Sequence, residues 1–187
     1  LVATGRVPNT SFLNPEATGI TLDKKGFIPV NDRLDTIVPG IFVIGDAKGG
    51  PAFTHISYDD HKVVLNNILE GGNATISGRL LPYVVFIDPQ LGCIGLNEKQ
   101  ARNQGYDYKV AKIPMSWVAR AIETDETKGL MKTIIDQKTK QILGAAILGI
   151  EGGELMTAIQ IAMLGNLPYT ALRDGMFAHP TLAESFN

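Results

Sequence analysis

The stretch LMKTIIDQKTKQILGAAILGIEGGELMTAIQIAMLGN, residues 130–166, decides the fold expected for the second half of this chain. Its first part holds two apolar runs, residues 130–137 and 142–150, and the polar KTK between them is typical of a tight turn. Residues 152–166 then repeat apolar side chains at helical spacing, which indicates a helix with one face toward a core or a subunit interface.

The residues before this stretch contain further strand-like runs and one short helical pattern. The expected strands are residues 82–89, 93–96, 106–114 and 118–123. A helix is expected at residues 97–105, because Asn97 and Gln100 have the spacing of a capping box and Gly105 is suited to end it. Strands followed by helices predict an α+β unit with a mostly antiparallel sheet.

The amino-terminal part carries a different pattern. Apolar runs at residues 1–4 and 41–46 predict buried strands, and residues 18–36 alternate like a short hairpin. Apolar residues recur at helical spacing from Thr54 to about Leu69. The small and polar EGGNATISG then interrupts every pattern, so we interpret it as a linker region. The predicted division is residues 1–72, a linker at 73–80 and a second unit at 81–187.

The composition is that of a globular protein, with 187 residues, 44% hydrophobic, and a formal net charge of −2. This charge predicts no nucleic-acid or membrane-surface partner, and no apolar run is long enough to span a bilayer. The single cysteine, Cys93, makes no internal disulfide and fits a reducing compartment, so we expect a cytoplasmic protein. Because the chain opens with LVATGRVPN and not with methionine, we also expect it to be part of a longer protein.

The run IFVIGDAKGGPAFTHIS, residues 41–57, is one of two stretches whose residues suit a functional site. Gly45 lets a ligand approach the backbone, and Asp46 at the end of an expected strand suits the hydroxyl groups of a sugar-like chain. The first amides of the helix that follows favour an anion, including the negative charge of a reduced flavin ring. The alternative is a structural turn in which Asp46 bonds its own backbone, and spacing alone favours this alternative.

The histidines and acidic residues near this run predict no metal site. His55 and His61 are six residues apart, whereas a helical metal pair needs a spacing of three or four. Asp59 and Asp60 are adjacent and point in different directions on the expected helix, so we interpret them as part of a solvated face.

The second stretch is HPTLAE, residues 179–184. Histidine is the side chain that titrates nearest neutrality, so His179 is suited to both accept and give a proton. Pro180 holds it away from helical geometry, and Glu184 is close enough along the chain to orient its ring. The alternative is a capping box in which Thr181 and Glu184 stabilise a helix start, which leaves His179 unexplained.

Four stretches in this order resemble the carboxyl-terminal part of a class I pyridine nucleotide-disulfide oxidoreductase, the flavin-dependent family of dihydrolipoamide dehydrogenase, glutathione reductase and mercuric reductase. LVATGRVPN resembles the segment that leaves the family's NAD(P) domain, and IFVIGDAKGGPAFTHIS its flavin-binding segment. PYVVFIDPQLGCIGLNEKQA resembles the start of its dimerisation domain, and HPTLAE its catalytic ending. FTHISYDDHKVV and NLPYTALRDGMFAHPTLAESFN are most similar to mercuric-reductase-like members of the reactive-chlorine-resistance type.

The resemblance implies a fold and a role for each segment. Residues 1–72 would hold the end of the NAD(P) domain and a partial FAD-binding α/β segment, and residues 81–187 the dimerisation domain. The implied catalytic residues are His179, as acid/base, and Glu184, which orients it. The implied cofactor-binding residues are Gly5, Gly45, Asp46, Ala52, Phe53, Thr54 and His55.

The resemblance also implies cofactors and partners. The parent protein would be a homodimer that passes electrons from NAD(P)H through FAD to a cysteine pair, and then to a disulfide or small-molecule substrate. The histidine of one subunit would serve the disulfide of the other. Because this chain has one cysteine and no G-x-G-x-x-G fingerprint, we expect it alone to bind little FAD and to be inactive. The alternatives are a stand-alone dimerisation or scaffolding module, and a parent that reduces oxygen, peroxide or a metal ion.

Overall fold

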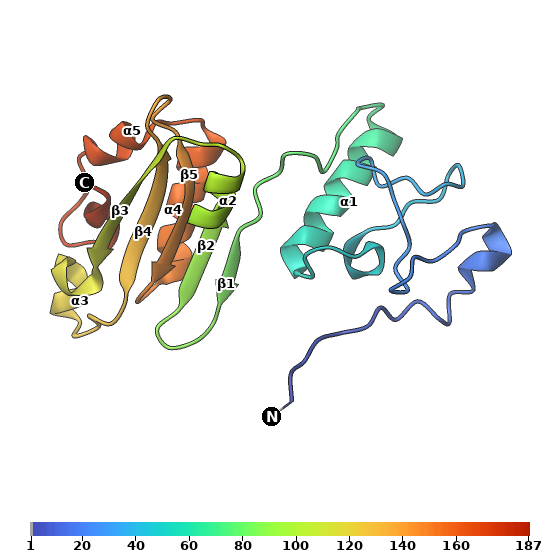
Figure 1. Ribbon diagram of the computed structural model, residues 1–187, viewed down its shortest axis with the longest axis horizontal. Coiled ribbons are helices and arrows are strands. Elements are labelled where there is room, and N and C mark those ends of the chain that lie inside the picture. Colours follow the sequence, from blue (N-terminus) through green and yellow to red (C-terminus); the bar gives the residue numbers. More distant parts are fainter. Residues whose placement is uncertain (1) are drawn as a thin grey trace. The chain divides into compact units, whose positions relative to one another are not determined.

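The second half of the chain forms a five-stranded sheet in the order β1-β2-β5-β4-β3 (Figure 1). The strands are β1 (Tyr83–Val85), β2 (Leu91–Gly95), β3 (Tyr108–Pro114), β4 (Leu130–Asp136) and β5 (Ile142–Leu148). All neighbouring pairs are antiparallel, which confirms the expected α+β fold. This computed structural model describes residues 2–187 and divides the chain into two units, Leu1–Arg79 and Leu80–Asn187.

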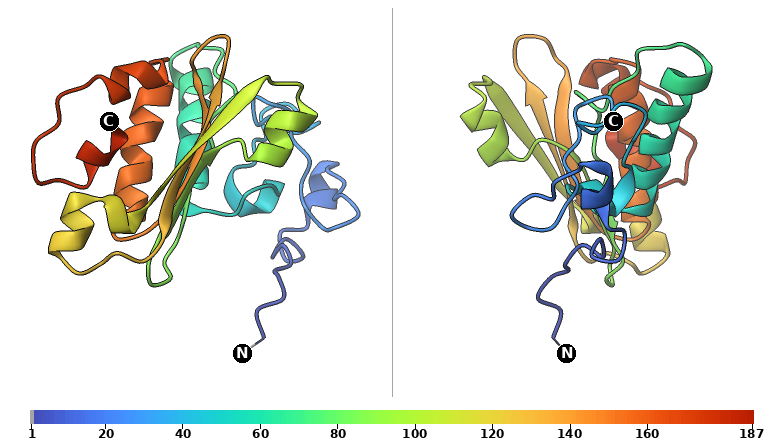
Figure 2. Two further views of the ribbon diagram at one scale, coloured as in Figure 1. Left: turned by 60° about the vertical axis from the view of Figure 1, so that its left-hand side comes forward. Right: turned by 90° about the vertical axis from the view of Figure 1, so that its right-hand side faces the viewer.

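Helix α4 (Gly152–Leu164) covers one face of the sheet by packing on β2 and β5, whereas α2 (Glu98–Asn103) lies on the opposite face (Figure 2). The expected capping box of α2 is present, with Asn97 and Gln100 bonding each other's backbone. The chain ends with α5 (Tyr169–Arg173) and the 3-10 turn η4 (Ala183–Phe186). Among residues 2–187, no helix is both long and apolar enough to cross a membrane.

The strand expected at residues 118–123 is wrong. The chain leaves the sheet at the Pro114–Leu130 pair and forms the 3-10 turn η3 (Met115–Trp117) and the helix α3 (Ala119–Glu123). Val118 and Ala121 are buried three residues apart, which is the spacing of one helical face and not of a strand. A six-residue run is too short for its alternation to separate the two periods.

The first unit contains the 3-10 turns η1 (Pro15–Thr18) and η2 (Gly45–Lys48) and the helix α1 (Thr54–Leu69), which matches the helix expected there. The strand expected at residues 41–46 is wrong, because the described part of this segment makes only an isolated bridge from Phe42 to Asp35. The expected hairpin keeps its Asp23 turn but forms no ladder. Residues 2–4 are exposed and form no strand, and residue 1 lies outside the described residues. A strand buried on both faces pairs along its edges, and among the described residues the segment 41–46 pairs only at the single bridge from Phe42 to Asp35.

The small, polar stretch 70–78 runs along the first unit. The side-chain amide of Asn67 accepts from the Ala74 N–H at 2.7 Å and donates to the Ala74 carbonyl at 2.9 Å. The Ile76 N–H donates to the Asp32 carbonyl at 2.9 Å. These bonds fix the backbone of residues that carry no regular secondary structure.

Gly92 of β2 lets α4 approach the sheet closely. A Cβ at this position would lie 2.4 Å from the Gly152 carbonyl oxygen and 2.8 Å from Met156 Cβ. We therefore expect Gly92→Ala to lower the free energy of unfolding by about 1–3 kcal/mol through overpacking. Urea unfolding followed by far-ultraviolet circular dichroism measures the effect.

Gly165→Ala at the end of α4 is the matched control. Gly165 has φ −78°, and a Cβ there would meet its nearest atom at 3.5 Å, which is ordinary contact. Its unfolding midpoint should stay near that of the unchanged chain. Equal midpoints for the two variants would contradict the close packing of α4 on β2.

Candidate functional site

The Gly45–Asp46 turn is held against α1. Gly45 is buried and has φ +66°, a conformation that favours glycine. A Cβ at this position would lie 2.6 Å from Ser57 Oγ and 3.2 Å from Ser57 Cβ. Both the backbone conformation and the available space therefore require glycine, and Asp46 carries the first side chain of the turn.

The Asp46 carboxylate is directed to solvent, with 58% of the side chain exposed. Arg6 reaches it from the start of the chain, with Nη1 3.5 Å from Oδ2, while Arg6 Nη2 donates to the Ala52 carbonyl at 3.1 Å. Arg6 therefore connects the turn with the segment before α1, and sequence reasoning missed it. Gly5, beside Arg6, is exposed and has φ +129°.

The start of α1 packs against this turn. Phe53 is the N-cap residue, and its ring stacks on His55 with the two centroids 5.2 Å apart. A phenyl ring cannot accept a hydrogen bond from the first helical amides, and Thr54 and His55 are exposed. An outward carboxylate beside a helix N-terminus suits a ligand that combines hydroxyl groups with a group that gains negative charge.

Asp60 is 0% exposed, so the prediction that it belongs to a solvated face is wrong. Its Oδ2 accepts from the Gly45 N–H at 2.8 Å and lies 3.2 Å from Lys48 Nζ, while Oδ1 accepts from Arg79 Nη1 at 2.7 Å. The half-exposed Asp59 also bonds Arg79, at 3.1 Å. No group of three or more His, Cys, Asp or Glu side chains within residues 2–187 is placed to hold a metal ion.

His179 and Glu184 meet in the carboxyl-terminal segment. The His179 Nδ1 atom lies 2.9 Å from Glu184 Oε2 and 3.1 Å from Oε1. The His179 side chain is 67% exposed, whereas Glu184 is 21% exposed. The carboxylate therefore anchors one ring nitrogen from the protein side, and Nε2 is the nitrogen that Glu184 does not engage.

The capping-box alternative is half present. The Glu184 N–H donates to Thr181 Oγ1 at 3.3 Å, as a cap would. The Glu184 carboxylate bonds His179 and not the backbone of the cap residue, and Thr181 Oγ1 donates to the Ala178 carbonyl at 2.7 Å. The threonine thus shapes the turn, while the glutamate side chain is available to the histidine.

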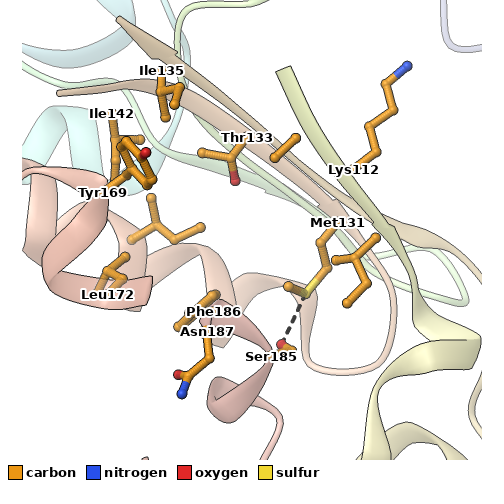
Figure 3. A pocket seen from close by; sticks show the side chains of 13 residues that line it. Lys112, Met131, Thr133, Ile135, Ile142, Tyr169, Leu172, Ser185, Phe186 and Asn187 are labelled. Carbon is orange, nitrogen blue, oxygen red and sulfur yellow. Dashed lines mark hydrogen bonds between the residues drawn. The ribbon is translucent and has the colours of Figure 1, made fainter. Parts of the chain in front are cut away.

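The last three residues of the chain help to line a pocket of about 230 Å³ (Figure 3). Strands β3, β4 and β5 form one wall, and α4, α5 and the last residues of the chain form the others. Ser185, next to Glu184, lines the pocket, and its hydroxyl lies 3.5 Å from Met131 Sδ. Phe186 packs edge-on to Phe177 with centroids 6.2 Å apart, which ties the turn to the segment before His179.

The chain belongs to the pyridine nucleotide-disulfide oxidoreductase family, a class of flavin-dependent oxidoreductases. Residues 81–187 match the dimerisation domain of that family, and residues 1–60 match its pyridine nucleotide-disulfide oxidoreductase domain. The family depends on FAD and NAD(P)H. The resemblance seen in the sequence is thereby confirmed.

The similar proteins include a reactive-chlorine-type reductase and a mercuric reductase, which are the branches expected from the sequence. The probable pyridine nucleotide-disulfide oxidoreductase RclA of Escherichia coli K12 is 40% identical over 188 residues, covering 100% of this chain and 43% of RclA. The solved structure of the HOCl-induced flavoprotein disulfide reductase RclA has a TM-score of 0.95 at 39% identity, with the same two coverages. A mercuric reductase of Staphylococcus aureus is 35% identical, over 98% of this chain and 34% of its own. The chain thus spans less than half the length of these relatives.

The geometry at Nδ1 predicts the tautomer of His179. A neutral ring that donates Nδ1–H to Glu184 leaves Nε2 unprotonated. In Glu184→Ala, the neutral ring should shift toward the Nε2–H tautomer that free imidazoles favour. Long-range ¹⁵N–¹H correlation spectra distinguish the two forms.

The chain has three histidines, so His55 and His61 serve as internal controls in the same spectra. Their signals should not move in Glu184→Ala. A neutral His179 that already carries its proton on Nε2 in the unchanged chain would contradict the hydrogen bond to Glu184.

Proposed function

We propose that this chain supplies the dimer interface and the acid/base pair of a dimeric, FAD-dependent NAD(P)H oxidoreductase that reduces a disulfide or a related acceptor. The observation that carries the proposal is the His179–Glu184 pair, in which a carboxylate holds one nitrogen of a ring that is otherwise exposed. A histidine whose ring is held in one orientation but stays exposed is suited to exchange a proton with a reacting atom that another subunit supplies. Membership of the family supports the same assignment.

In this proposal His179 holds and transfers a proton at Nε2. Reduction of a disulfide consumes two electrons and one proton to give one thiolate and one thiol. A protonated imidazole beside the thiolate stabilises it, because an adjacent cation lowers the pKa of a thiol. Glu184 keeps the ring aligned through its contact with Nδ1. By likeness to the family, the reacting cysteine pair belongs to the partner subunit.

We assign the remaining predicted residues to the cofactors. Gly45 and Asp46 would bind the ribityl chain of FAD, and the run from Ala52 to His55 would lie along the flavin. Gly5 would lie at the edge of the nicotinamide dinucleotide. When bound, FAD would carry two electrons from NAD(P)H to the disulfide. The outward Asp46 carboxylate and the exposed start of α1 support this assignment.

The same proposal divides the chain into residues 1–72 of the cofactor-binding domains, a linker at 73–80 and a dimerisation domain at 81–187. The match of residues 81–187 to the dimerisation domain supports the last part. The half-buried free Cys93 is compatible with a reducing compartment, so we assign the parent to the cytoplasm.

The outer face of α4 is our candidate for the dimer surface. Glu154, Thr157, Ile161 and Leu164 form its exposed stripe, and Ile161 and Leu164 are 64% and 63% exposed. Leu167, just after the helix, is 43% exposed. Exposed large apolar side chains such as Ile161, Leu164 and Leu167 are typical of a protein interface when they lie together.

Reconstitution tests the enzymatic part. Alone, the chain should show little flavin absorbance after incubation with FAD and gel filtration. Mixed with the amino-terminal part of its parent, it should form a stoichiometric yellow complex that oxidises NADH or NADPH with a disulfide acceptor. His179→Gln in that mixture should lower kcat by about 10²–10⁴-fold, the usual contribution of a general acid/base.

His61→Gln is the matched control, because His61 is also an exposed histidine and has no assigned role. It should retain the activity of the unchanged mixture. A mixture that binds FAD but reduces no acceptor would favour the scaffolding alternative, and equal loss in both variants would remove His179 from the chemistry.

The dimer surface has a separate test. An interface well above about 1,000 Å² should hold two copies together at micromolar concentration. Ile161→Glu places a charge in the exposed stripe of α4 and should give a monomer by sedimentation equilibrium. Ile37→Glu, at a residue 74% exposed in the first unit, should leave the dimer intact. A monomeric unchanged chain would contradict the assignment.

A further inference from the structure

We propose that Asp60, together with Lys48, is a positioning residue that fixes the Gly45–Asp46 turn for the cofactor. The inference rests on the proposed function of that turn, and it adds two residues outside the predicted set. A purely structural role, in which the charged cluster only stabilises the first unit, is the competing explanation. The geometry favours positioning because the carboxylate bonds the backbone of the turn itself.

Helix α1 holds Gly45 from two sides. Ser57 and Asp60 lie three residues apart and therefore share one face of the helix. Ser57 Oγ would be 2.6 Å from a Cβ on Gly45, so the helix blocks any side chain there. Asp60 Oδ2 accepts the Gly45 N–H at 2.8 Å, so the same face also fixes the direction of the peptide that precedes Asp46.

Lys48 holds the other end of the turn. Its side chain is only 5% exposed, and Nζ lies 3.2 Å from Asp60 Oδ2 and 3.3 Å from the Gly49 carbonyl oxygen. The Asp60 carboxylate thus bonds Gly45 at the start of η2 directly and reaches Gly49, just after η2, through Lys48. Lysine is rarely buried without a partner, so this placement indicates a specific contact.

Arg79 fixes the orientation of the carboxylate. Its Nη1 donates to Asp60 Oδ1 at 2.7 Å, opposite the oxygen used by Gly45 and Lys48. With both oxygens bonded and 0% exposure, the side chain has little freedom to rotate away. A buried carboxylate with charged partners on both sides is costly to break, so the geometry resists disturbance.

Because Gly45 is held in place, the backbone of the next residue, Asp46, is also held in place. This residue follows Gly45 directly and points its carboxylate outward, where the proposal places the ribityl chain. A group that is already held in its binding position loses less freedom when the ligand arrives. Asp60 would therefore raise the affinity for FAD without touching it.

The test separates positioning from stability. The double variant Lys48→Met/Asp60→Leu replaces the buried pair by apolar side chains of similar size, which often preserves stability. Its thermal midpoint should fall only slightly, because Arg79 keeps its bond to Asp59. The Gly45 amide, which has lost its acceptor, should exchange with solvent at least ~10-fold faster. In the mixture with the amino-terminal part of the parent, the dissociation constant for FAD should rise about 10-fold.

Asp60→Asn is the second variant in case the double variant unfolds, and it should speed Gly45 exchange by a smaller factor. Asp59→Asn is the control, because Asp59 is 47% exposed and does not bond the turn. Unchanged Gly45 exchange in the folded Asp60 variants would overturn the positioning role, whatever the flavin does. Faster exchange of the Gly45 amide with unchanged FAD affinity would overturn the link between Asp60 and the cofactor. Failure of the unchanged mixture to bind FAD would instead refute the proposed function and the cofactor half of this inference.

Discussion

Backbone pairing on both edges of β5 is the constraint on which the second unit depends. The strand bonds β2 on one side and β4 on the other, and its buried Ile142, Ala145 and Ile147 join the core that α4 completes. The last turn of the chain packs on the same core through Leu182 and Phe186. The position of His179 therefore follows from the sheet, although the residue itself lies in an irregular segment.

Much of this unit could be predicted from the sequence because its elements have strong local signals. The runs around the KTK turn form β4 and β5, and the apolar repeat after them forms α4. Prediction failed where the outcome depends on distant partners. Residues 119–123 form the helix α3 after strand β3 ends at Pro114, and among the described residues the segment 41–46 pairs only through the bridge from Phe42 to Asp35.

The same distinction applies to the candidate site. His179 and Glu184 are five residues apart, so spacing allowed them to meet, but it also allowed a capping box, and the resemblance to the family was needed to predict the pair. Asp60 was misinterpreted because its partners lie up to 19 residues away, and adjacent aspartates on a helix usually face solvent. Arg6 bonds Asp46, which is 40 residues away in the sequence, and no local sequence pattern predicts such a contact.

The Gly45–Asp46 turn is held by two electrostatic contacts of opposite character. Arg6 and Asp46 are 69% and 58% exposed, so dissolved ions reach them and weaken their attraction. Lys48 and Asp60 are 5% and 0% exposed and are shielded from those ions. As ionic strength rises, the outer tie to the start of the chain loosens while the inner one persists. The turn thus keeps its shape in concentrated salt, while the amino-terminal segment that carries Arg6 is held less firmly.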